Sequence, residues 1–205
     1  MNRVKTDAFW KWFSENNDSL VMLDDLSEEA KENLLNDFDI NLKKYSQGLS
    51  FEIGEQTTNG RTIVFSAEGD TEYFEDVINL VDSVPVLDWW DFVPFKQPQG
   101  AEIKVHYERF FFNTKDMFFL PLESEDNPEI IGLRVAIKNF DEENEDLLVG
   151  VYVTLEAQIG EFDCSTIMGY LELCPISENM EEEGFTPLVK FPEFVEWFKN
   201  EHDLN

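Results

Sequence analysis

The sequence contains none of the short motifs that mark the common nucleotide, metalloprotease and serine-hydrolase sites. It has no GxxxxGK[ST], GxGxxG, HExxH or GxSxG, and so it lacks the phosphate-binding loop, the helical zinc site and the nucleophile elbow as local signatures. Imidazole groups are also scarce, because His106 and His202 are the only two histidines in 205 residues. We therefore expect neither a metal nor a cofactor, and the sequence leans away from an enzyme.

Cysteine and long apolar runs are missing as well. Cys164 and Cys174 are the only cysteines, and because their spacing is not that of a CxxC pair they predict buried thiols in a reducing compartment. No segment approaches the roughly 18–20 apolar residues of a membrane span, and the first residues lack the apolar run of a signal peptide. We expect a cytoplasmic protein.

Positive charge is in short supply. The chain carries 15 Lys and Arg against 44 Asp and Glu, which gives a formal net charge of −29 at pH 7. Such a surface repels phosphate, so direct binding to nucleic acid or to anionic membranes is disfavoured. A basic protein partner would instead be attracted by the same field. The alternative is that the acidity serves solubility alone.

Aromatic residues, in contrast, are abundant: the chain has 19 Phe, 5 Trp and 5 Tyr. FWKWF, residues 9–13, lies near one end, and FVEWF, residues 194–198, lies near the other. At about 100° per residue, each motif places its rings on one face of a helix. Because an isolated helix would leave that face in water, we expect both helices to dock on a shared core. The alternative is that they form a dimer or bind a partner groove.

Apolar periodicity and turn residues predict both helices and strands between the two terminal motifs. Ser27 is expected to cap a helix, and Asn59-Gly60 is typical of a tight hairpin. An acidic loop at residues 141–146 is expected to separate two strands that pair antiparallel. Helices are predicted over residues 6–16, 27–45, 71–83, 156–164 and 192–203, and strands over 49–55, 61–67, 89–95, 103–112, 130–138, 147–155 and 167–174.

These elements predict an α+β fold, with a mostly antiparallel sheet and helices packed on it, in a single domain over residues 1–205. The order strand, strand, helix, strand is expected twice, which suggests two related halves at residues 46–112 and 117–190. The helices at 6–16, 27–45 and 192–203 would pack on these halves. Identity between the halves is low, so the order of elements is the only support for a repeat.

The most interesting carboxylates belong to the segment EAQIGEFDCS. Glu156, Glu161 and Asp163 surround a glycine there, and acids on adjacent turns can share a proton or hold a metal. His106 would supply a base. The alternative is that these carboxylates line the solvated side of a short helix.

The acidic loop at residues 141–146 does not match an EF-hand calcium site. Asp146 stands at the sixth place of an EF-hand pattern and Tyr152 at the twelfth, whereas the loop requires glycine and glutamate at these places. A solvated connector is therefore the better interpretation.

Three stretches resemble an uncharacterised bacterial family. They are FWKWF near the start, FSAEGDTEYFEDVINLVDSVPVLDWWDFVPFKQP at residues 65–98, and YVTLEAQIGEFDCS at residues 152–165. Together they extend the similarity over most of the chain. The resemblance implies a bacterial, cytoplasmic setting and brings no catalytic residues with it.

Three functions follow as hypotheses. The first is a non-catalytic acidic module that binds a basic protein partner, in the manner of an inhibitor or immunity protein. The second is an acid–base or metal-assisted hydrolase that uses Glu156, Glu161, Asp163 and His106. The third is a structural module that forms a homo-oligomer through its aromatic helices.

Overall fold

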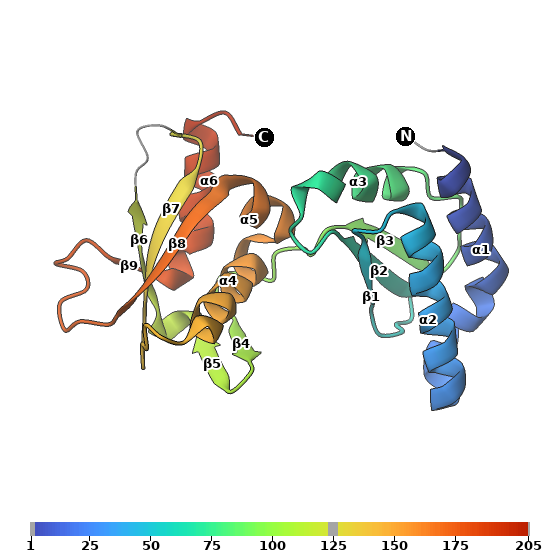
Figure 1. Cartoon of the computed structure of the whole chain (residues 1–205), viewed down its shortest axis with the longest axis horizontal. Helices are drawn as coiled ribbons and strands as arrows, with labels where there is room; N and C mark the ends of the chain where they lie inside the picture. The colour runs from blue at the N-terminus through green and yellow to red at the C-terminus, as the bar shows by residue number, and fades with distance from the viewer. Residues whose placement is uncertain (1–2, 123–126, 205) are drawn as a thin grey trace. The chain divides into compact units, whose positions relative to one another are not determined.

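The computed structural model describes residues 3–122 and 127–204. By internal contacts the chain falls into two units, Met1–Lys96 (unit 1) and Gln97–Asn205 (unit 2). Helices and strands are mixed in both, and antiparallel strand pairs outnumber parallel ones (Figure 1). This confirms the predicted α+β class. Over the described residues, no helix combines the length and the apolar character needed to cross a membrane.

Unit 1 has a three-stranded sheet in the order β1-β2-β3. β1 and β2 are antiparallel, whereas β2 and β3 are parallel and are connected through α3. The hairpin predicted at Asn59-Gly60 is present, and a side chain at Gly60 (φ +117°) would lie 2.2 Å from the Trp89 carbonyl oxygen. The elements are α1 (Arg3–Val21), α2 (Glu28–Tyr45), β1 (Ser50–Ile53), β2 (Arg61–Ser66), α3 (Phe74–Asp82) and β3 (Trp90–Pro94).

The FWKWF motif docks α1 on the core of unit 1. Phe9, Trp10 and Phe13 are all buried, and the Trp10 indole donates a hydrogen bond to the Leu80 carbonyl oxygen at 3.2 Å. The ring centroid of Phe13 lies 5.3 Å from that of Phe92 on β3. Docking of the first aromatic helix on the protein's own core is therefore confirmed.

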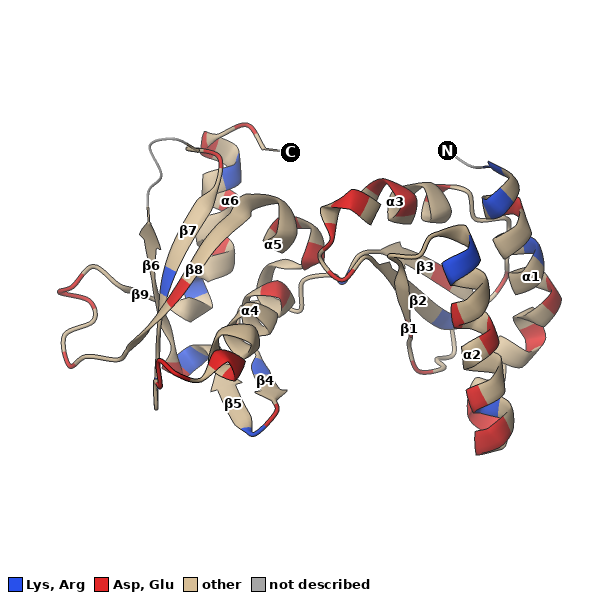
Figure 2. Cartoon of the chain, viewed as in Figure 1, with Lys and Arg blue, Asp and Glu red and all other residues tan. Residues whose placement is uncertain are grey.

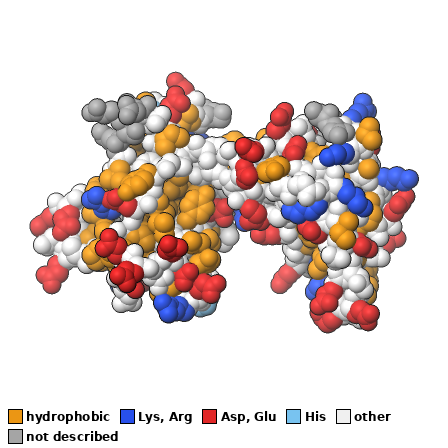
Figure 3. Space-filling model, viewed as in Figure 1, with side chains coloured by type: hydrophobic (Ala, Val, Ile, Leu, Met, Phe, Trp, Pro, Cys, Tyr) orange, Lys and Arg blue, Asp and Glu red, His pale blue; other side chains and the backbone are white. Residues whose placement is uncertain are grey.

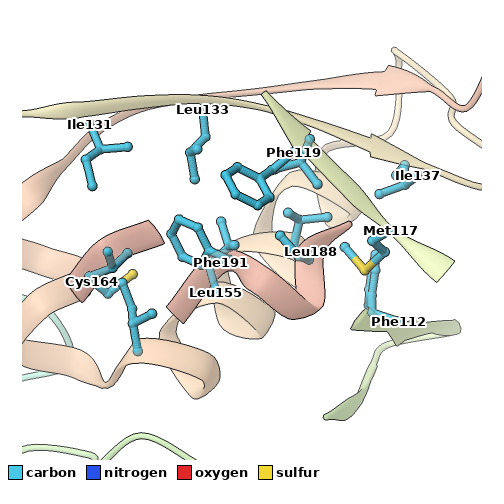
Figure 4. Packing of buried hydrophobic residues seen from close by; sticks show 14 of the residues in the cluster. Phe112, Met117, Phe119, Ile131, Leu133, Ile137, Leu155, Cys164, Leu188 and Phe191 are labelled. Carbon is cyan, nitrogen blue, oxygen red and sulfur yellow. The ribbon is translucent and has the colours of Figure 1, made fainter. Parts of the chain in front are cut away.

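Unit 2 has a four-stranded sheet in the order β8-β7-β6-β9 and a separate hairpin, β4-β5. β6 and β7 are antiparallel, and β7 and β8 are parallel. Its core includes residues of β6, β7, α4, α5 and α6 (Figure 4). The elements are β4 (Lys104–Tyr107), β5 (Phe110–Asn113), β6 (Phe118–Leu122), β7 (Ile131–Ile137), α4 (Glu145–Ile159), α5 (Glu161–Ile167), β8 (Met168–Pro175), β9 (Thr186–Pro187) and α6 (Phe191–Glu201).

Two predicted strands of unit 2 are wrong. Residues 147–155 form the middle of α4, because an Asn144 cap and core packing outweigh the strand preference of their valines. Consequently they do not pair with residues 130–138. The single strand expected over residues 103–112 is the β4-β5 hairpin, which turns at Glu108 (φ +50°) and Arg109.

The FVEWF motif docks α6 on unit 2, but not with all its rings. Val195 and Phe198 are buried, whereas the Trp197 side chain is 55% exposed. Phe191, at the start of α6, meets Phe119 of β6 with ring centroids 5.4 Å apart. The two aromatic motifs thus belong to separate core clusters, one in each unit, and the expectation of a shared core is wrong.

Both units contain the order strand, strand, helix, strand with the same strand directions. In unit 1 the strands are β1, β2 and β3, and in unit 2 they are β6, β7 and β8. The second unit uses residues 118–122 as the first strand of this order, and that the two halves are related stays a prediction. The boundary between the units falls after Lys96. Association of the units into one domain over residues 1–205 stays a prediction.

Gly150 provides a test of the packing between α4 and the β4-β5 hairpin. A Cβ atom at Gly150 would lie 2.2 Å from Cε2 of Phe112, which is 5% exposed. Although alanine normally favours a helix over glycine by about 1 kcal/mol, we expect Gly150→Ala to lower the free energy of unfolding by about 1–3 kcal/mol through overpacking. Urea denaturation measures this change. Phe112→Leu should cost less in the Gly150→Ala background than in the wild type, and equal costs would contradict the contact.

Candidate functional site: an apolar groove between α4 and β8

The predicted catalytic side chains are distributed over three elements of unit 2. Glu156 lies on α4, Glu161 and Asp163 lie in the first turn of α5, and His106 is exposed on β4. Glu161 is fully buried. Lys199 of α6 donates to both carboxylate oxygens of Asp163 at 2.9 Å, so this carboxylate links two helices.

A metal site is not seen in the part of the chain that the structure describes, since no three His, Cys, Asp or Glu side chains there are grouped to hold an ion. A catalytic role for the four predicted residues stays a prediction.

The acidic segment at residues 141–146 leads into α4. Asp141 and Glu143 are exposed, as expected of a solvated connector. The Asn144 side chain, however, accepts a hydrogen bond from the Asp146 amide at 3.1 Å and caps the helix. Glu145 and Asp146 then occupy the first turn, where the helix dipole favours negative charge. The last two of the six residues of the predicted loop are therefore the start of the helix.

An open apolar groove of about 380 Å³ lies between α4 and the first half of β8. We call it the α4–β8 groove. In Figure 3, hydrophobic side chains gather over this part of unit 2. Leu148 and Val149 are 43% and 42% exposed, and Tyr170 is 57% exposed. The lining consists of Leu148, Val149, Tyr152, Met168, Gly169, Tyr170 and Leu171.

The groove exists because the apolar surface of α4 is broader than the part of it that the core covers. Val151 and Leu155 are fully buried, while Leu148, Val149 and the half-buried Tyr152 lie on the adjoining, outer side of the helix. A helix that is apolar all round normally lies in a protein interior. The outer side of α4 is therefore a hydrophobic surface for which internal packing supplies no cover.

The edge of the sheet forms the other wall. β8 is the last strand in the order β8-β7-β6-β9, so within the described sheet its outer edge has no partner strand. Gly169 allows this wall to lie close to Ile130, because a Cβ there would lie 2.3 Å from Cγ2 of Ile130. An unpaired strand edge presents backbone donors and acceptors to any chain that approaches.

Carboxylates stand at both ends of the apolar side of α4. Glu145 lies one turn before Leu148 and Val149, and Glu156 lies one turn after Tyr152. None of the residues that line the groove is charged. Arg134, in the adjacent strand, is paired with Glu172. Figure 2 shows the acidic residues at the start of α4. The result is an uncharged strip between two negative ends.

Two groups at or next to the groove that could ionise, Tyr152 and Cys164, stay neutral near pH 7. Burial is the main cause that raises the pKa of the Cys164 thiol to about 12, and burial likewise raises the pKa of Tyr152 to about 12. The Cys164 sulfur lies 3.8 Å from that of Met168, which lines the groove. Both cysteines are free. Neither group therefore supplies a thiolate or phenolate near neutral pH, so the groove is suited to apolar contact.

Comparison of the chain with models of protein families, with curated proteins and with solved structures finds no match. The groove must therefore be interpreted from its own chemistry.

Sequence reasoning missed Leu148, Val149 and Tyr152 as surface residues, because it placed them in a paired strand. The available signal was Asn144 followed by two acids, which is typical of a helix start.

The raised pKa of Cys164 predicts a loss of stability at high pH. In the unfolded chain this thiol ionises near pH 9.0, whereas in the folded protein it stays protonated until about pH 12. Raising the pH through this interval favours the unfolded state, with a slope of up to about 1.4 kcal/mol per pH unit. Urea denaturation between these pH values should show a steeper decline for the wild type than for Cys164→Ala. Parallel declines would contradict the burial of the thiol.

Proposed function

We propose that the protein is a non-catalytic binding module and that the α4–β8 groove of unit 2 binds a basic protein partner. The observation that supports this most is an exposed apolar strip with a carboxylate at each end, on a chain of net charge −29. The partner would present apolar side chains flanked by Lys or Arg. An inhibitor or immunity-type role is consistent with a site that binds without supplying catalytic groups.

The two kinds of surface would contribute different parts of the binding. Apolar side chains such as Leu148 and Tyr152 release water when covered, at about 25 cal/mol per Å². Charges at the rim chiefly accelerate association, and their effect weakens as salt rises. We therefore infer an interaction whose affinity depends on the groove and whose association rate depends on ionic strength.

The free cysteines and the net charge also bear on the cellular location and the oligomeric state of the protein. Two free cysteines support a reducing, cytoplasmic compartment. The large negative charge opposes binding to nucleic acid and also opposes self-association, because identical acidic surfaces repel each other. We propose that the protein binds its partner as a monomer.

A selection from a random peptide library tests the proposal. Peptides of about 12 residues that are enriched on the wild type should carry net positive charge and at least two apolar residues. Their affinity should fall by about tenfold or more for Leu148→Ser/Val149→Ser, which corresponds to about 1.4 kcal/mol. It should also fall between about 50 mM and 500 mM salt.

The matched control is Ile40→Ser, since Ile40 on α2 of unit 1 is 43% exposed, as Leu148 is. This variant should bind the selected peptides as the wild type does. Circular dichroism establishes that both variants are folded. No enrichment above background, or equal affinity for the groove variant, would refute the proposed function.

A further inference from the structure

We propose that the partner binds as an extended strand, which pairs with the outer edge of β8 and places alternate apolar side chains on α4. This inference rests on the proposed function and adds the conformation and chemistry of the bound segment. It identifies the ligand as a short β-forming stretch with apolar residues at every second position and basic residues at both ends.

The first observation is the unpaired edge. Among the described strands β8 pairs with β7 alone, in parallel from Tyr170 and Gly132 to Pro175 and Ile137. In the described sheet no other strand follows β8. The backbone groups that point away from β7 are therefore available along most of the strand. Pro175 at the end has no amide hydrogen, so we place the pairing over residues 168–174.

The second observation is the width of the helical layer. An α-helix is about 10 Å across, and neighbouring strands are about 4.8 Å apart, so one helix covers roughly two strands. The inner side of α4 packs with Leu133 and Val135 of β7 in the same core cluster. Its outer side, with Leu148 and Val149, lines the groove together with residues 168–171 of β8. One additional strand would lie on this outer side and cover it.

The third observation is the match to alternating side chains. In a strand, successive side chains point to opposite faces of the sheet. Leu171 and Leu173 of β8 pack against the core on the helical side, so the side chains of an added strand that face the same way would meet Leu148 and Tyr152. The intervening side chains would face solvent and can be polar.

The negative charge at the groove predicts basic residues at both ends of the bound strand. The same charge argues against a second copy of this chain as the ligand. Glu145 and Glu156 at the two ends of the strip attract Lys or Arg, whereas another molecule of this chain would bring a further charge of −29 to the same place. The partner that fits is therefore a basic, apolar strand from a different protein.

The test uses a peptide with two lysines at each end and three valines alternating with threonines between them. Fluorescence anisotropy measures its binding to the full chain. We expect binding that is lost with Leu148→Ser/Val149→Ser, kept with Ile40→Ser, and lost when glutamates replace the lysines. N-methylation of every second residue can be placed in two registers. In the register that removes the amide donors facing β8, it should weaken binding by about tenfold or more. In the other register it should have little effect.

Hydrogen exchange gives an independent readout, because amides of residues 168–174 should become protected when the peptide binds. The peptide could bind in the groove with equal affinity in both N-methylation registers and without new protection of amides 168–174. This result would overturn strand addition and leave the proposed function standing. A peptide that does not bind would overturn strand addition, whereas failure of the library selection would overturn both. A dimer of the chain that is lost in the groove variant would assign the edge to a second copy and overturn the proposal.

Discussion

Unit 2 depends on a single helix that is apolar on nearly every side. The inner side of α4 fills the core under β7, Gly150 admits the ring of Phe112 from the β4-β5 hairpin, and the outer side remains in contact with water. Burying two of these surfaces holds the sheet and the hairpin together. The third surface gives the unit its apolar groove, so structure and proposed function draw on the same helix.

The shared topology of the two units shows how such a groove arises. In unit 1 the strand after the crossover, β3, is covered by rings of α1, with Trp10 and Phe92 at a centroid distance of 5.0 Å. In unit 2 the aromatic helix α6 packs instead on β6, through Phe191 and Phe119. β3 and β8 are both last strands of their sheets, so in the described residues each has one edge without a partner strand; only β8 has the apolar groove beside it. The same order of strands thus has aromatic rings on its last strand in unit 1 and an apolar groove beside its last strand in unit 2.

Local signals predicted most elements, and tertiary contacts explain the failures. Ser27 and the Asn59-Gly60 turn are read from a few neighbouring residues, and the structure places them as expected. Residues 147–155 were misassigned because an apolar, valine-rich run looks the same in a buried strand and in a buried helix. The groove could not be predicted, because it depends on which side of α4 the sheet covers.

The predicted catalytic carboxylates illustrate a second limit of the sequence. Spacing suggested that Glu161 and Asp163 act together, but one is enclosed and the other is held by Lys199. Burial and pairing are properties of the folded chain, and they decide whether a carboxylate has a structural or a chemical role. No pattern within EAQIGEFDCS distinguishes the two.

Because β8 has a free edge, the acidity of the chain also bears on aggregation. An exposed strand beside apolar side chains is a template for uncontrolled cross-β growth, and mutual repulsion between molecules keeps such templates apart. Acidification to the isoelectric point, near pH 4.1, would remove this repulsion. The charge that would attract the proposed basic partner would therefore also oppose polymerisation of the protein.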